Sequence, residues 1–75
     1  MTRASKQIRR NEVGNVLVST VKIDDFYETA AFPIKDNGTD YGTEIVMVRT
    51  YGQLGEAVAA HEAAVCFVTV GMEEA

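Results

Sequence analysis

Alternating apolar and polar positions predict strands in the first two thirds of the chain. From Val13 to Ile23 the chain is rich in β-branched residues and lacks helical spacing, which indicates a strand centred on Asn15 to Lys22. The Asp24-Asp25 pair then supplies a turn. The segment from Phe26 to Ile34 alternates as a returning strand, in which Pro33 can only end the strand or lie at a sheet edge. The two segments therefore predict a β-hairpin.

A two-residue turn at Asp24-Asp25 would fix the register of this hairpin. The register then pairs Ile23 with Phe26, Val21 with Glu28, Ser19 with Ala30 and Leu17 with Phe32, and these eight residues share one face. The less apolar face carries Val16, Val18, Thr20, Lys22, Tyr27, Thr29 and Ala31. A longer turn with other pairs stays open, because a type I′ turn prefers Asn-Gly to Asp-Asp.

The rest of the chain predicts a third strand and then a helix. A run of turn formers from Lys35 to Thr43 precedes a strand from Glu44 to Tyr51, whose continuously apolar centre indicates burial on both faces. After Gly52, apolar residues follow a helical stripe made of Leu54, Ala57, Val58, His61, Ala64, Val65 and Val68. Gly71 is a reasonable helix stop, and residues 66–70 could instead form a fourth strand. We expect an α+β fold: a three-stranded antiparallel meander with the C-terminal helix packed on one face.

Charge divides the chain into a basic start and an acidic body. Of the net charge of −4, residues 1–12 carry +3 and the remainder −7. We expect residues 1–12 to be a disordered arm and residues 13–75 to be one small domain. The basic residues of the arm are Arg3, Lys6, Arg9 and Arg10. Because clustered cations neutralise phosphates, a nucleic-acid-binding arm is an alternative function.

Length and cysteine usage indicate a cytosolic protein that gains stability from a partner. A chain of 75 residues buries only about 60% of the surface that its unfolded form exposes. The single cysteine, Cys66, cannot form an internal disulfide, which points to a reducing compartment. The basic start is followed by no long apolar segment, so we expect neither a signal peptide nor a membrane span.

Candidate chemistry centres on His61, the only histidine, which lies on the core side of the predicted helix. A lone histidine there usually has a structural role, and the register makes Glu28 its expected partner, as a fold-specifying pair or a proton-transfer pair. The spacing of Cys, His and carboxylates fits neither a zinc nor a calcium site. Cys66 is expected beside the helix interior and Ser19 within a strand, so neither is an activated nucleophile. We expect no catalytic, metal or cofactor residues, and thus no enzyme.

Surplus apolar surface is the more useful clue to function. If the helix covers the face of Glu28, the bare face of the sheet carries Val16, Val18 and Tyr27, with either Ile45 and Met47 or Val46 and Val48. Such a patch usually marks an interaction surface, and a homodimer that packs sheet against sheet would bury it. The alternative is that a terminal segment of the chain itself covers this face.

The chain also resembles a group of small proteins encoded by bacteriophages and prophages of actinobacterial hosts. The resemblance rests on a VSTV strand at Val18 to Val21, an ETxxF strand at Glu28 to Phe32, and a helix of the form Y...EAxxxHExxV from Tyr51 to Val65. Ala60 replaces a glycine that often precedes the histidine of that group, and the helix entry is less acidic. The resemblance implies a phage origin and a common fold, without a mechanism.

These observations together predict a non-enzymatic phage accessory protein in the bacterial cytoplasm. We expect it to bind a host protein or a second copy of itself through its bare sheet face or its acidic surface. A modulator of a host process would be such a protein, because an acidic surface can compete for sites that hold nucleic acid.

Overall fold

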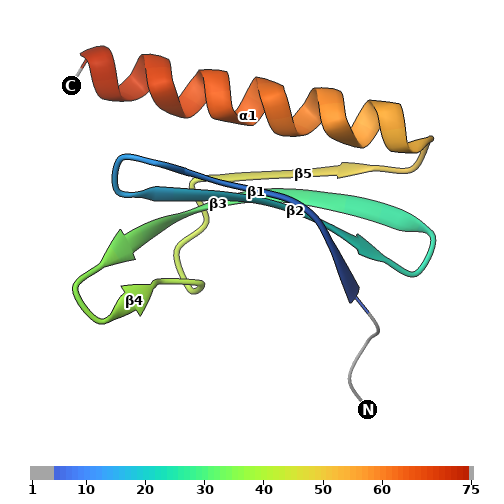
Figure 1. Ribbon diagram of the computed structural model, residues 1–75, viewed down its shortest axis with the longest axis horizontal. Helices are drawn as coiled ribbons and strands as arrows, with labels where there is room; N and C mark the ends of the chain where they lie inside the picture. The colour runs from blue at the N-terminus through green and yellow to red at the C-terminus, as the bar shows by residue number, and fades with distance from the viewer. Residues whose placement is uncertain (1–4, 75) are drawn as a thin grey trace.

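A computed structural model describes residues 5–74, which fold as a curled antiparallel sheet with one long helix packed on it (Figure 1). The elements are β1 (Ser5–Val13), β2 (Val16–Ile23), β3 (Phe26–Lys35), β4 (Gly38–Thr39), β5 (Val46–Thr50) and α1 (Leu54–Glu74). Strands β1, β2, β3 and β5 lie side by side in that order, and the short β4 pairs with the far end of β3. The α+β class is confirmed, with five strands instead of three.

The N-terminal segment is a strand over its described part, so the prediction of a disordered arm is wrong for residues 5–12. Strand β1 pairs antiparallel with β2 from Ser5↔Ile23 to Val13↔Val16, with a β-bulge between Gln7 and Arg9. The two strands are joined by Gly14-Asn15, where Gly14 has a φ of 58°, a value that glycine adopts readily. This tight turn brings a charged segment into the sheet as an edge strand. Residues 1–4, which include Arg3, lie outside the described part.

The predicted hairpin has the expected register. Strands β2 and β3 pair at Ile23↔Phe26, Val21↔Glu28, Ser19↔Ala30 and Leu17↔Phe32. The turn stays two residues long because Asp24 adopts a φ of 54°, which aspartate tolerates better than most residues. The predicted third strand is β5, which is shorter than expected and pairs with β3 from Ala31↔Val46 to Tyr27↔Thr50.

Helix α1 extends beyond its predicted end. Residues 66–70 are helical, so the alternative of a fourth strand there is wrong, and the helix continues through Gly71 to Glu74. Glycine ends a helix when it takes a positive φ, and Gly71 does not take one. Gly71 therefore does not end the helix, contrary to the prediction from the sequence.

Helix α1 covers the face of the sheet opposite to the one we expected. The core beneath it is a cluster of Val18, Ala31, Ala64 and Val68. Val16 packs against this cluster, so Val16 and Val18 lie under the helix rather than on a bare interaction face. Tyr27 shares the covered side and is half-buried, with Lys22 over its ring, whereas Met47 pairs with Ala30 and belongs to the other face. The four residues of the predicted interaction patch therefore do not form one surface.

Candidate functional site

Beneath α1, His61 is held by hydrogen bonds at both ring nitrogens. Its Nδ1 lies 2.8 Å from Thr20 Oγ1, and Thr20 Oγ1 lies 2.7 Å from Thr29 Oγ1. Its Nε2 lies 2.7 Å from Asn11 Oδ1 on β1. Because an amide oxygen only accepts, Nε2 carries the ring proton and donates it to Asn11. Nδ1 then accepts from the Thr20 hydroxyl, which in turn accepts from Thr29.

This arrangement holds His61 neutral. The ring is only 1% exposed, and burial is the main cause that lowers its pKa below the ordinary value of 6.5. The positive charge of Arg9 on β1 lowers the pKa further, while the negative charge of Glu62, the residue that follows His61 in α1, raises it. Since Thr20 and Thr29 are also buried, solvent does not reach this side of the network. Its role is structural, because it ties α1 to three strands.

Glu28, the partner predicted for His61, lies on the opposite face of the sheet. Its Oε2 accepts a hydrogen bond from Arg49 Nε at 3.2 Å. The pairing with His61, and with it the proton-transfer pair, is therefore wrong. The register of the hairpin was right, but the helix packs on the other face, so His61 meets Thr20 rather than Glu28. The role of Asn11 was missed because β1, the strand that carries it, was not expected.

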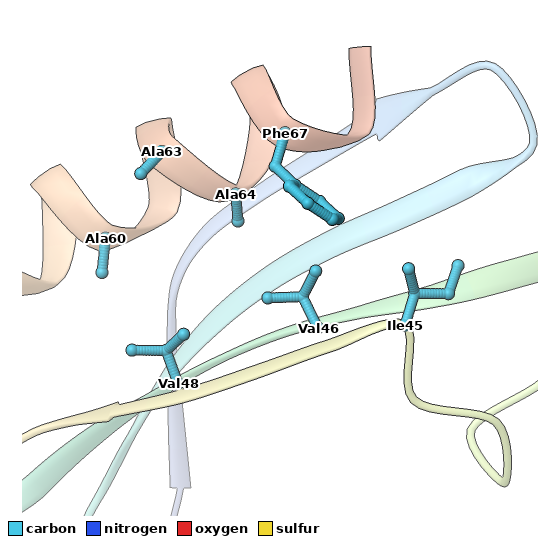
Figure 2. Close-up of a pocket in the computed structure, with 7 residues that line it drawn as sticks. All are labelled: Ile45, Val46, Val48, Ala60, Ala63, Ala64 and Phe67. Atoms are coloured by element: carbon cyan, nitrogen blue, oxygen red, sulfur yellow. The ribbon is translucent and has the colours of Figure 1, made fainter. Parts of the chain in front are cut away.

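An open, apolar groove lies between α1 and β5, and we call it the α1/β5 groove. It has a volume of about 450 Å³ and is lined by Ile45, Val46, Val48, Ala60, Ala63, Ala64 and Phe67. Figure 2 shows Val46 and Val48 pointing up toward the helix, and Phe67 reaching down from it. Phe67 is 63% exposed and Val48 is 41% exposed. No charged side chain lines the groove, so it is suited to an apolar ligand surface.

The groove exists because one helix cannot cover four strands. Strands about 4.8 Å apart give a sheet about 14 Å across between its outer strands, whereas a helix with side chains is about 10 Å wide. Helix α1 contacts the central strands β2 and β3 more extensively than the outer strands β1 and β5, and Ile45 and Val48 at the β5 margin stay exposed. Strand β5 also pairs only with β3 among the described strands, which leaves its outer edge free.

The outer surface of α1 continues the apolar surface of the groove. Residues 63–72 contain no charged residue, and no Lys or Arg occurs after Arg49. Of residues 54–71, the buried ones are Ala57, His61, Ala64 and Val68. By length and composition alone, the stretch Leu54–Gly71 is the one helix of the described residues that is apolar enough to cross a membrane. Cys66 is exposed on this surface, which corrects the expectation that it lies near the helix interior.

The face of the sheet that α1 leaves uncovered is partly shielded by the chain itself. The loop that contains β4 lies on this side, away from the helix (Figure 1). Tyr41 from this loop packs edge-on against Phe32, with ring centroids 5.1 Å apart. Leu17 on the same face is buried, as is Ala30. This face is therefore a weaker candidate for a partner than the α1/β5 groove.

The basic residues of the N-terminal segment do not gather into one patch. Arg9 Nη1 lies 3.8 Å from Glu62 Oε1, and Arg10 Nη2 lies 3.3 Å from Glu12 Oε2. Lys6 lines a small polar pocket with Ser5, Lys22 and Asp24. Neighbouring residues of a strand point to opposite faces, so Arg9 and Arg10 diverge. Two of the three described cations thus face carboxylates of the same chain.

Among the described residues, no three His, Cys, Asp or Glu side chains gather as a metal site requires. Comparison of the chain with protein-family models, with curated proteins and with solved structures finds no match.

Proposed function

We propose that this chain is a non-enzymatic accessory protein that acts by binding a protein partner in the α1/β5 groove. The observation that carries the proposal is the uncharged groove of about 450 Å³, continuous with an exposed apolar helix surface. Exposed apolar surface of this kind marks protein interaction sites in soluble proteins. This groove replaces the sheet face of Val16, Val18, Tyr27 and Met47, which the sequence pattern favoured and the packing of α1 contradicts.

The occupant that suits the groove is an amphipathic helix of the partner. Helix α1 does not fully cover the margin of the sheet at β5, where Ile45 and Val48 line the groove and remain exposed. A strand added at the free edge of β5 would lie in the plane of the sheet, and would therefore widen the floor of the groove without filling it. A helix that presents apolar side chains at spacings of three and four would fill it.

The proposal includes a bacteriophage origin and action in the bacterial cytoplasm, where a host protein or a second copy would be the partner. Its support is the resemblance in the VSTV, ETxxF and Y...EAxxxHExxV segments. The alternative of nucleic-acid binding has less support, since Arg9 and Arg10 face Glu62 and Glu12 instead of forming a cluster.

Capture experiments with matched variants test the proposal. Immobilised wild-type protein, Val48→Lys and Tyr41→Lys are each incubated with a soluble lysate of an actinobacterial host, and retained proteins are quantified by mass spectrometry. Val48 lines the groove, whereas Tyr41 is an exposed residue that packs against Phe32 on the face of the sheet that α1 leaves uncovered. We expect a partner, including added untagged copies of the chain itself, that Tyr41→Lys retains and Val48→Lys loses. The same retained set for all three proteins contradicts the proposal.

A further inference from the structure

We infer that the helix which fills the α1/β5 groove is α1 of a second copy of this chain. In the resulting symmetric dimer each α1 lies in the groove of the other copy, so that two helices form one layer between two sheets. This inference rests on the proposed protein-binding role and names the partner.

The first argument is that α1 is apolar on almost every side. A helix that is apolar all round is normally buried all round, whereas a helix that packs on one sheet needs a single apolar stripe. Here the buried stripe is Ala57, His61, Ala64 and Val68. The remaining surface of α1 also lacks charge over residues 63–71. The sheet of one copy therefore leaves a large part of the apolar surface of α1 without cover.

The second argument is that groove and helix are complementary when the chain meets itself. The flank of α1 toward β5 carries Ala60, Ala63 and Phe67, which line the groove. At 100° per residue, Ala59, Cys66 and Val70 lie on the side of α1 away from its own sheet, and all three are exposed. When α1 enters the groove of a second copy, this outer side meets Val46 and Val48 of that copy. The two helix flanks meet each other, and small alanine side chains allow a close approach.

Symmetry then fixes the direction of the helices. Only a twofold axis parallel to α1 places each helix in the other copy's groove while leaving both sheets outside. The two helices therefore run parallel, and each flank residue lies near its own counterpart. Ala63 faces Ala63 of the second copy near the middle of the helix, and Glu56, which shares this flank, lies in the exposed first turn at its N-terminal end.

The third argument is that the surface is large enough. A helix of 21 residues is about 31 Å long, and the shared layer is about two helix widths across, roughly 20 Å. Each copy would then bury on the order of 600 Å², which reaches the lower limit for specific, stable interfaces. Phe67 contributes strongly, because 63% of its surface is exposed in one copy. Aromatic residues at the centre of an interface commonly dominate its affinity.

Charge favours a second copy over a lipid surface. Helices that lie on membranes carry Lys and Arg on their polar side, which bind anionic headgroups. The described part of α1 carries acidic residues and no basic ones, with Glu56 in its first turn and Glu62 next to Arg9. Withdrawal of α1 into lipid would also break the hydrogen bonds of His61 to Thr20 and Asn11, and the imidazole would then enter lipid without a hydrogen-bond partner.

Sedimentation equilibrium over a range from micromolar to millimolar protein tests the inference. We expect wild-type protein to approach twice the 8.2 kDa mass of one chain as concentration rises. Phe67→Glu should weaken the dimer at least about 100-fold, because it places a charge in the centre of the interface. Tyr41→Glu is the matched control, since Tyr41 is 64% exposed but lies away from the groove, and it should change the dissociation constant by less than about threefold. Circular dichroism verifies that both variants remain folded.

Cysteine cross-linking supplies a second measurement in a Cys66→Ser background. Under mild oxidation Ala63→Cys should form a disulfide-linked dimer, because the two positions face each other. Asn15→Cys, in the exposed turn after β1, should stay a single chain at the same concentration. Equal cross-linking of both variants, or a dimer that Phe67→Glu leaves intact, overturns the inferred arrangement.

Failure of this inference differs from failure of the proposed function. If wild-type protein keeps the mass of one chain at every concentration while Val48→Lys still loses a lysate partner, the second copy is the wrong occupant and protein binding stands. If neither self-association nor any partner depends on Val48, both are wrong. Co-sedimentation of the single chain with phosphatidylcholine vesicles, lost in Phe67→Glu, would assign the apolar surface to lipid and also overturn the inference.

Discussion

Replacement of Thr20 by valine should destabilise the fold strongly although it removes a single oxygen atom. Thr20 is fully buried, and its Oγ1 lies 2.8 Å from His61 Nδ1 and 2.7 Å from Thr29 Oγ1. Valine has nearly the same shape, so the substitution opens no cavity and leaves the packing of β2 in place. The effect therefore measures the hydrogen bonds alone.

The expected magnitude follows from the number of bonds lost. Two buried hydrogen bonds contribute about 1 kcal/mol each, and a buried ring nitrogen left without a donor costs about 1–3 kcal/mol. We expect the free energy of unfolding to fall by about 3–5 kcal/mol. A chain of 75 residues has a total stability of roughly 4–11 kcal/mol, so the change is a large fraction of it.

Thr50→Val is a matched control with the opposite sign. Thr50 Oγ1 is buried and has no hydrogen-bond partner among the described residues. Removal of this hydroxyl should leave stability unchanged or raise it by about 1 kcal/mol, because an unsatisfied buried group is lost. Urea unfolding followed by far-ultraviolet circular dichroism measures both variants at one protein concentration, since a dimer would make stability concentration-dependent. Equal effects of the two substitutions would refute the hydrogen-bond argument.

Three further predictions concern pH, the first turn and the surface ion pair. Burial lowers the pKa of His61 below 6.5 in the folded chain, so the unfolded chain takes up a proton first as pH falls. The free energy of unfolding should therefore be constant above about pH 6.5, decline below it, and level off once the ring of the folded chain also becomes protonated. Unfolding curves measured across this pH range should lack the decline in His61→Leu. Gly14→Ala should lower the free energy of unfolding by about 1–2 kcal/mol, because Gly14 has a φ of 58°, and an unchanged urea midpoint would contradict this account of the turn. Glu28→Gln should change stability by less than about 1 kcal/mol, because Glu28 pairs with Arg49 near the surface, and a larger loss in urea unfolding would favour a buried role.

Sequence periodicity was sufficient for the central hairpin and for the start of the helix. The pairing of Ile23 with Phe26 followed from a two-residue turn, and each later pair followed from the period of two along the strands. The helical stripe contained Ala57, His61, Ala64 and Val68, which are the buried residues of α1. These elements were predictable because local spacing determines them.

Strand β1 could not be recognised by the same signal. Its residues are mostly charged or polar, since β1 is an edge strand whose two faces are largely exposed. The informative signal was the Gly14-Asn15 dipeptide, which is typical of a two-residue hairpin turn. Without β1 there was no candidate for Asn11, and the partners of His61 could not be assigned correctly.

The choice of sheet face was decided by polar groups, not by apolar area. The face that carries Leu17, Phe26 and Phe32 is the more apolar of the two, yet α1 packs on the face of Thr20 and Thr29. Hydrophobic burial is non-directional, so it distinguishes poorly between two faces that are both apolar. The loop of Tyr41 also covers part of the more apolar face, which reduces the gain from placing a helix there.

The same polar network determines which side of α1 is left for a partner. A helix that is apolar nearly all round has no stripe that fixes its rotation, because several rotations would bury similar area. Only the observed rotation gives His61 both Thr20 and Asn11, and any other would leave buried polar groups unpaired. That rotation directs Ala63 and Phe67 toward the groove. Thr20→Val should therefore weaken self-association as well as folding, although Thr20 lies on β2, beneath the buried side of α1 and away from the second copy.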